Sequence, residues 1–237
     1  MNSLLSFPAG GMAVVVGATG GIGAALFGQL QQSNRFAMTV GLSRHIEPCL
    51  DITSASSVES AARNVVGCGL PLRIVMVTTG ILHAEDLLPE KSWRELDALK
   101  LARSFAVNTI GPAVVMKNFL PLLPQDGKSV FAVLSARVGS IGDNRLGGWY
   151  SYRASKAALN QIIRTAAIEL ARSRPHAICV ALHPGTVATP LSAPFAKSQP
   201  EVQAPELSAS RLLTVLESLD RHDTGKFYDH LGKAVEW

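Results

Sequence analysis

The sequence predicts an α/β fold in which a doubly wound parallel sheet carries helices on both faces. Three observations predict it. Short apolar runs rich in β-branched residues alternate with segments of helical period along the chain. Apolar residues make up 47% of the 237 residues and charged residues only 17%, as a large buried sheet requires. Glycines and short polar residues follow several of the predicted strands, where such sheets bind ligands.

The first predicted unit is a strand, a glycine-rich turn and a helix. Residues 12–16 are predicted to form a buried strand, and residues 24–30 begin a helical period. Gly17, Gly21 and Gly23 lie between them with the spacing G-x-x-x-G-x-G. Glycines let the backbone approach a pyrophosphate, and a helix N-terminus offers it free N–H groups. The unit therefore predicts a site for dinucleotide phosphates.

The second predicted strand, residues 36–42, ends at Ser43 and Arg44. NAD-binding folds usually place an acidic residue here to bind the ribose 2′-OH. A hydroxyl and a guanidinium suit a 2′-phosphate instead. The position favours NADP(H) over NAD(H), although Arg44 could also be an ordinary exposed arginine.

The middle of the sheet follows from residues 49–77. A brief strand end is predicted at residues 49–52, then a helix to about residue 66 with Ser56 and Glu59 as its capping box. Residues 72–77 are predicted to form the next buried strand. Because the carboxyl ends of parallel strands meet at one edge, four positions are expected to converge there: Gly17, Ser43, Asp51 and Gly80.

A helix is predicted over residues 104–123, with Pro112 well inside it. Proline has no N–H, so the carbonyl of Asn108, four residues earlier, loses its partner within the helix. A kinked packing helix would account for this pattern. A carbonyl that holds a water near a reaction centre would account for it as well.

The next predicted strand, residues 129–135, leads to a helix that runs from residue 148 to about residue 172. Tyr152 and Lys156 are four residues apart in this helix and therefore share one face. A lysine cation beside a phenol favours the phenolate, which lowers a pKa that is otherwise about 10. Tyr152 is thus a candidate general acid/base, although such pairs also occur by chance on surface helices.

The last part of the chain supplies two strands, a helix and a segment with the composition of a lid. Strands are predicted at residues 177–182 and 225–229, and a helix at residues 207–219. Residues 190–207 carry four prolines among small and apolar residues, directly after a strand. This composition and place are typical of a lid over a binding site.

The bulk properties disfavour several function classes. The net charge is +4, but the basic residues form no run, so neither nucleic acid nor a membrane surface is an expected partner. Cys49, Cys68 and Cys179 lack metal-ligand spacing, and we expect free thiols, no metal site and a reducing compartment. Residues 1–11 lack a signal-peptide pattern and no apolar run is long enough to span a bilayer, which predicts a cytoplasmic protein.

Taken in order, the motifs resemble those of the short-chain dehydrogenase/reductase family over essentially the whole chain. They are Gly17/Gly21/Gly23, Asp51, Gly80, Asn108, a serine at a strand end, Tyr152-x-x-x-Lys156, and Pro184-Gly185 with Thr189. Residues 108–112, 135–140, 147–156 and 225–229 resemble the C-factor and sniffer-like branch of that family. The resemblance implies one Rossmann-type, dinucleotide-binding domain over residues 1–237, with a substrate lid at about residues 190–207.

The resemblance also implies a function and a set of site residues. The protein would be an NADP(H)-dependent oxidoreductase that transfers a hydride between the nicotinamide and a carbonyl or alcohol carbon of a small molecule. The catalytic residues would be Tyr152 as proton donor and acceptor, Lys156 on the nicotinamide ribose, Asn108 with a relay water, and Ser135. The cofactor would be bound by Gly17, Thr19, Gly21, Ile22, Gly23, Ser43, Arg44, Asp51, Ile52, Gly80, Tyr152, Lys156, Pro184, Gly185, Val187 and Thr189.

Three positions depart from the family pattern. The usual Asn-Asn-Ala-Gly is Thr-Thr-Gly-Ile at residues 78–81, and Val16 stands where a threonine is common. We interpret these two changes as compensatory, leaving no buried group unpaired. The catalytic serine is usually the second of a pair, and that position is Ala136. Either Ser135 at the strand end or Ser140 in the loop would bind the substrate oxygen, and we prefer Ser135.

A protein of another class would share many of these features. A nucleotide-binding signalling or regulatory protein could keep the fold with little or no turnover. The retained Tyr152, Lys156 and Asn108 favour the enzyme. The resemblance is also consistent with a homo-oligomer, and it does not identify the substrate.

Overall fold

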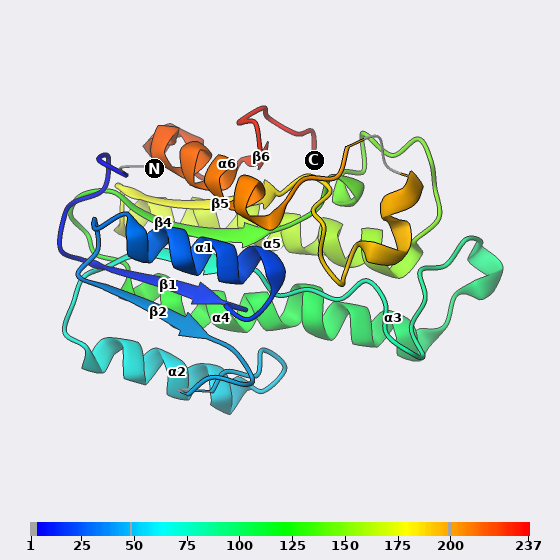
Figure 1. Cartoon of the computed structure of the whole chain (residues 1–237), viewed down its shortest axis with the longest axis horizontal. Helices are drawn as coiled ribbons and strands as arrows, with labels where there is room; N and C mark the ends of the chain where they lie inside the picture. Colours follow the sequence, from blue (N-terminus) through cyan, green and yellow to red (C-terminus); the bar gives the residue numbers. More distant parts are fainter. Residues whose placement is uncertain (1–3, 48, 199–200) are drawn as a thin grey trace.

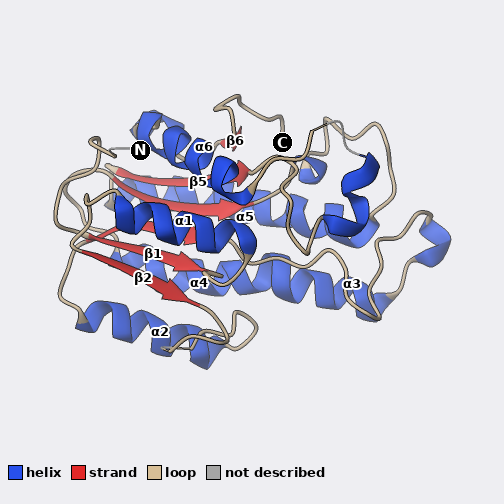
Figure 2. Cartoon of the chain, in the orientation of Figure 1, coloured by secondary structure: helices blue, strands red, loops and turns tan. Residues whose placement is uncertain are grey.

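In the computed structural model, which describes residues 4–47, 49–198 and 201–237, the strands form a parallel sheet between two layers of helices (Figures 1 and 2). The strands are Met12–Val16 (β1), Met38–Leu42 (β2), Leu72–Val77 (β3), Ser129–Leu134 (β4), Ala177–His183 (β5) and Phe227–Asp229 (β6). Their order is β2-β1-β3-β4-β5-β6, and each neighbouring pair is parallel. The Rossmann-type doubly wound sheet is therefore confirmed.

Both faces of the sheet are buried because alternate residues of each strand enter separate apolar cores. Val14 and Val16 enter one core, and Ala13 and Val15 enter the other. The first core is covered by the helices Ala55–Gly67 (α2), Gly111–Phe119 (α4) and Tyr150–Ser173 (α5). The second is covered by Gly21–Gln32 (α1) and Pro205–Ser218 (α6), which lie in front of the sheet in Figure 1.

Two predicted local features between β2 and α2 are wrong. The N-cap of α2 is Ser54 rather than Ser56, and its side chain accepts a hydrogen bond from the N–H of Ser57 at 3.3 Å. Residues 49–51 have no regular secondary structure, and a turn at residues 52 and 53 follows them, so the predicted strand end is absent. There the Asp51 carboxylate accepts the N–H of Thr53 at 2.9 Å, a local bond that competes with strand pairing.

The helix predicted over residues 104–123 begins earlier and is interrupted. Ala98–Phe105 (α3) starts after Asp97, whose side chain accepts the N–H of Lys100 at 2.9 Å. A π-turn, Ala106–Ile110, joins α3 to α4, and the N–H of Gly111 bonds to the carbonyl of Ala106. Only Gly111 separates this wider turn from Pro112, which has no N–H to donate.

The lid is shorter than predicted, because α6 already begins at Pro205, in a first-turn position that proline favours. The described part of the lid contains a short helix, Ala193–Ser198. Residues 199 and 200, which the lid prediction includes, are not among the described residues. No described helix is long and apolar enough to cross a membrane.

Candidate active site

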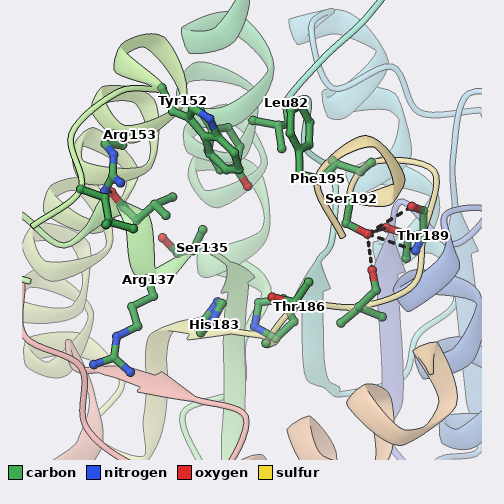
Figure 3. Close-up of a pocket in the computed structure, with 18 of the residues that line it drawn as sticks. Leu82, Ser135, Arg137, Tyr152, Arg153, His183, Thr186, Thr189, Ser192 and Phe195 are labelled. Atoms are coloured by element: carbon green, nitrogen blue, oxygen red, sulfur yellow. Dashed lines mark hydrogen bonds between the residues drawn. The ribbon is translucent and has the colours of Figure 1, made fainter. Parts of the chain in front are cut away.

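A cavity of about 550 Å³ opens at the carboxyl ends of β4 and β5 (Figure 3). Its walls are residues 135–138 after β4, the loop before α5, the first turns of α5, His183 at the end of β5 with residues 184–187 after it, and the lid. Tyr152 comes from α5, Ser135 from the end of β4, Thr189 from the segment after β5, and Phe195 from the lid. The topology thus brings together side chains that are far apart in sequence.

Tyr152 and Lys156 lie on one face of α5, but their polar groups do not pair. The Lys156 Nζ is 5.8 Å from the centroid of the Tyr152 ring and donates to the Leu134 carbonyl at 2.8 Å. Burial raises the pKa of Tyr152 to about 12 and lowers the pKa of Lys156 to about 8. The expectation that Lys156 lowers the tyrosine pKa is wrong for this structure, because burial causes the shift and the ammonium is bonded to the Leu134 carbonyl instead.

Asn108 is fully buried in the π-turn and fixes the loop after β3. Its Oδ1 accepts the N–H of Ile81 at 2.8 Å, and its Nδ2 donates to the Ile81 carbonyl at 2.8 Å. A Cβ at Gly80 would lie 3.5 Å from Asn108 Oδ1 and 3.7 Å from Lys156 Nζ. Asn108, Gly80 and Lys156 therefore meet, as expected, while the water on the Asn108 carbonyl stays a prediction.

The two candidate serines lie in different surroundings. Ser135 lines the cavity, and its hydroxyl donates to Asn160 Oδ1 at 2.6 Å. Ser140 is not a lining residue, and its hydroxyl accepts the N–H of Asp143 at 3.1 Å. The cavity thus favours Ser135. Asn160 was not predicted as a site residue, although its place four residues after Lys156 on α5 puts it on the same helix face.

The glycine-rich turn has the features that a pyrophosphate needs. Helix α1 begins after Gly20 with no side-chain cap and no acidic residue in its first turn, so an anion would meet its free N–H groups. Gly17 has a φ of 90°, and a Cβ at Gly23 would lie 2.1 Å from the Gly17 carbonyl. Gly21 lies beside Thr189, since a Cβ there would be 2.7 Å from its methyl group. These residues fit a dinucleotide.

The remaining predicted cofactor residues lie on either side of this turn. Thr19 is exposed in the turn, and Ile22 lines the cavity. Ser43 is buried, whereas Arg44 is exposed after β2. Hydrogen bonds from Thr53, with a smaller contribution from Arg44, hold the pKa of Asp51 below its usual value. Ile52 packs beside Gly111, and the residues after β5 that line the cavity include Pro184, Gly185, Val187 and Thr189.

Glu90 is an important residue that the sequence did not reveal. It is only 2% exposed, and its carboxylate accepts both the N–H of Ser151, at 3.1 Å, and the Ser151 hydroxyl. Its carbonyl accepts the N–H of Trp149, the N-cap of α5, which has a left-handed φ of 53° and no side-chain cap. Glu90 thus caps the helix that carries Tyr152. No local pattern could indicate this contact, because 61 residues separate the partners.

Aromatic contacts join the lid to the start of α5. The Phe195 ring lies 5.0 Å from Trp149 and 5.8 Å from His83 between centroids, and Trp149 also contacts Tyr152. His83 Nε2 is 3.0 Å from the Pro190 carbonyl. These contacts close one side of the cavity.

The compensation expected in the loop after β3 is incomplete. The Thr78 hydroxyl donates to the Val16 carbonyl at 2.8 Å, so the loop still bonds to β1. The Thr79 hydroxyl, however, is buried without a partner, and the prediction that no group is left unpaired is wrong.

Within the described ranges, no three potential metal ligands cluster, and Cys49, Cys68 and Cys179 are free.

Known proteins share this sequence pattern and this fold. The family model described as short chain dehydrogenase matches residues 11–200. The 1-hydroxy-2-glutathionyl-2-methyl-3-butene dehydrogenase of Rhodococcus sp. (strain AD45) is 32% identical over 192 residues, 81% of this chain and 80% of that protein. The C-signal protein of Myxococcus xanthus is 37% identical over 144 residues, 60% of this chain and 82% of that protein. The NADPH-bound carbonyl reductase from chicken fatty liver superposes with a TM-score of 0.82 at 26% identity, covering 97% and 100% of the two chains.

Proposed function

Because the chain belongs to the short-chain dehydrogenase family, we propose that it is an NADP(H)-dependent oxidoreductase for a carbonyl or alcohol group of a small molecule. One observation carries the proposal. Tyr152 and Ser135 line the cavity, and so do Ile22 and Thr189, which lie at the glycine-rich turn where the dinucleotide is expected. A substrate in the cavity would therefore lie between the proton donor and the cofactor.

In this proposal Tyr152 gives its hydroxyl proton to the substrate oxygen during reduction and takes it back during oxidation. The bound cofactor would supply or accept the hydride. Ser135 would hydrogen-bond the same substrate oxygen. Lys156 uses one of its three donors on the Leu134 carbonyl, which leaves two for a ribose hydroxyl. Asn108 holds the loop at Gly80 and Ile81 in place beside that ammonium.

NADP(H) is the proposed cofactor because Arg44 follows β2 and is exposed, where a 2′-phosphate could accept its N–H groups. The chicken carbonyl reductase of similar fold binds NADPH, which supports the same choice. We further infer a cytoplasmic location from the free cysteines of the described chain.

The test is oxidation of NADPH with a panel of aldehydes and ketones. Wild type should turn over at least one of them, and Tyr152→Phe should lower kcat by about 100-fold or more with NADPH binding unchanged. Tyr150→Phe is the matched control, since Tyr150 is on the same helix but does not line the cavity. Tight NADPH binding without any turnover would favour the alternative, a nucleotide-binding signalling or regulatory protein. The similarity to C-signal is the observation that supports this alternative.

A further inference from the structure

The charges around the cavity are unevenly distributed. Its lining includes three arginines, Arg137, Arg145 and Arg153, and one carboxylate, Asp143. In Figure 3, Arg137 and Arg153 lie on one side, Thr189 and Ser192 lie on the other, and Tyr152 and Ser135 stand between them. Arg137 and Arg153 are therefore on the side of the cavity away from Thr189, which lies beside Gly21 of the glycine-rich turn.

Two of the three arginines have carboxylates nearby. Arg137 Nε donates to Asp143 at 2.5 Å, and this bond, with a smaller effect of Asp229, raises the arginine pKa. Arg145 is exposed, donates to the Gly142 carbonyl at 2.8 Å, and contributes to lowering the pKa of Asp143. Burial lowers the pKa of His183 to about 4, so this lining residue is neutral near pH 7.

The charge of Arg153, unlike that of the other two arginines, is not balanced by a carboxylate among the described residues. Its Nε donates to the Gly148 carbonyl at 3.0 Å and its Nη1 to the Val138 carbonyl at 3.2 Å, which are both neutral acceptors. Among the residues that the structure describes, no carboxylate forms an ion pair with it. Burial lowers its pKa, so the guanidinium is partly desolvated without a counter-charge. Such a group binds an anion strongly, because water screens the attraction less and a carboxylate accepts two of its N–H groups.

We propose that the cavity is specific for carbonyl or alcohol substrates that carry a carboxylate, with Arg153, assisted by Arg145, as the group that binds it. The inference rests on the proposed function, which identifies the cavity as the substrate site. The carbonyl lies at Tyr152 and Ser135, and the carboxylate lies toward α5 and the loop before it. Arg153 thereby selects the substrate and orients it relative to the neighbouring Tyr152.

The anion is not a phosphate of the cofactor. The predicted phosphate positions are the N-terminus of α1 and Arg44, and both belong to the first two βα units. Arg153 follows Tyr152 on α5 and contacts residues 138 and 148, on the loop that leads away from β4. Thr189, beside Gly21 of the glycine-rich turn, lies across the cavity from Arg153 (Figure 3), so a cofactor held by that turn would approach Tyr152 from the side opposite Arg153.

Two aldehydes that differ in charge but hardly in shape test the proposal. The first is 4-carboxybenzaldehyde and the second is methyl 4-formylbenzoate, each reduced at saturating NADPH. Wild type should show a kcat/KM about tenfold or more higher for the acid, the size of one charge-assisted hydrogen bond. Intrinsic reactivity works against this result, because an ester withdraws electrons from the aldehyde more strongly than a carboxylate does. Equal values, or a preference for the ester, would overturn the inference.

Variants identify the residue responsible. Arg153→Gln should remove the preference for the acid, Arg153→Lys should keep part of it, and Arg145→Gln should reduce it less than Arg153→Gln. The ester rate in each variant reports whether the site is still intact. Arg164→Gln is the matched control, because Arg164 is on the same helix, donates to the Gly225 carbonyl and does not line the cavity. An unchanged acid-to-ester ratio in Arg153→Gln would contradict the assignment.

A binding experiment separates this inference from the proposed function. The complex with NADPH is titrated calorimetrically with 4-(hydroxymethyl)benzoate or with its methyl ester, neither of which can accept a hydride. The acid should bind about tenfold more tightly to wild type, and Arg153→Gln should bind both alike. If no aldehyde consumes NADPH while the acid still binds selectively, the oxidoreductase proposal fails and the anion site stands. If aldehydes consume NADPH but the acid and the ester bind equally tightly, the oxidoreductase proposal stands and the anion site fails.

Discussion

Glu90 should determine both the stability of the protein and the position of Tyr152. The N-cap residue of α5 is Trp149, whose side chain caps nothing, so the first N–H groups of the helix depend on a residue outside it. Glu90 bonds the N–H and the hydroxyl of Ser151, and Tyr152 is the next residue. Replacing Glu90 by alanine removes these contacts without changing α5 itself.

The expected loss follows from the groups that Glu90→Ala leaves behind. Losing an N-cap interaction costs about 1 kcal/mol. A buried hydroxyl or N–H of Ser151 that remains unsatisfied adds roughly 1–3 kcal/mol. The free energy of unfolding should therefore fall by about 2–4 kcal/mol. Glu90→Gln keeps an acceptor but loses the charge at the helix N-terminus, and it should cost about 1 kcal/mol.

Urea unfolding followed by circular dichroism measures these differences, and kcat should fall in the same order because a frayed first turn displaces Tyr152. Glu95→Gln is a suitable control, since among the described residues its carboxylate accepts only the exposed N–H of Lys91, and the change should cost less than about 0.5 kcal/mol. If Glu90→Ala is no less stable than Glu95→Gln, the capping role assigned to Glu90 is refuted.

The other predictions concern the cofactor, the serine, the lysine and the proline. NADPH should bind more tightly than NADH in calorimetric titrations, and Arg44→Ala should abolish the difference; an unchanged preference would exclude Arg44. Ser135→Ala should lower kcat by about 10²–10³-fold, more than Ser140→Ala does, because a hydroxyl at the substrate oxygen stabilises developing charge; the opposite order would assign the role to the loop. The pKa of Lys156 falls from about 10.4 when unfolded to about 8 in the fold, so the unfolded chain binds more protons between these values. The free energy of unfolding of wild type, minus that of Lys156→Met, should therefore rise from pH 8 to pH 10, and a flat difference would mean that burial does not shift this lysine. Pro112→Ala supplies an N–H that favours a regular α-helix over the π-turn, so kcat should fall while NADPH binding and stability stay close to normal; unchanged kcat would remove the proposed water relay.

The sheet could be predicted because each strand is identified by a pattern of neighbouring residues in the sequence. The strands β1 and β3 are buried at every residue. β1 is an uninterrupted apolar run with a glycine directly after it, and β3 is apolar except for Arg73, so both patterns indicate a buried strand. Helix ends were harder to predict. The start of α2 depends on which of several nearby serines turns its side chain inward, and Ser54 rather than Ser56 does so. A pattern of residue types cannot distinguish these neighbours.

The residues that meet at the candidate site could be predicted only in part, since Asn160 and Glu90 were missed, and the electrostatics of the site could not be predicted. Helical spacing places Tyr152, Lys156 and Asn160 on one face of α5, and strand ends place Ser135 and Gly80 nearby. The pKa of Tyr152 depends instead on how much water reaches its hydroxyl and on whether Lys156 is already bonded, which only the three-dimensional packing decides. The same is true of Arg153, whose missing counter-charge becomes visible only when every neighbour is placed.

The order of the strands has a consequence for how the chain folds during its synthesis. After β1 has joined β2 and β3, each later strand is added beside the one that precedes it in sequence, β4 on β3, β5 on β4 and β6 on β5. The sheet can therefore grow at one edge as the chain leaves the ribosome, and no completed pair has to be reopened. The last strand, Phe227–Asp229, covers the edge of β5. A nascent chain that stalls before β6 would leave this edge of β5 unpaired, and such an edge is a template for pairing with another chain.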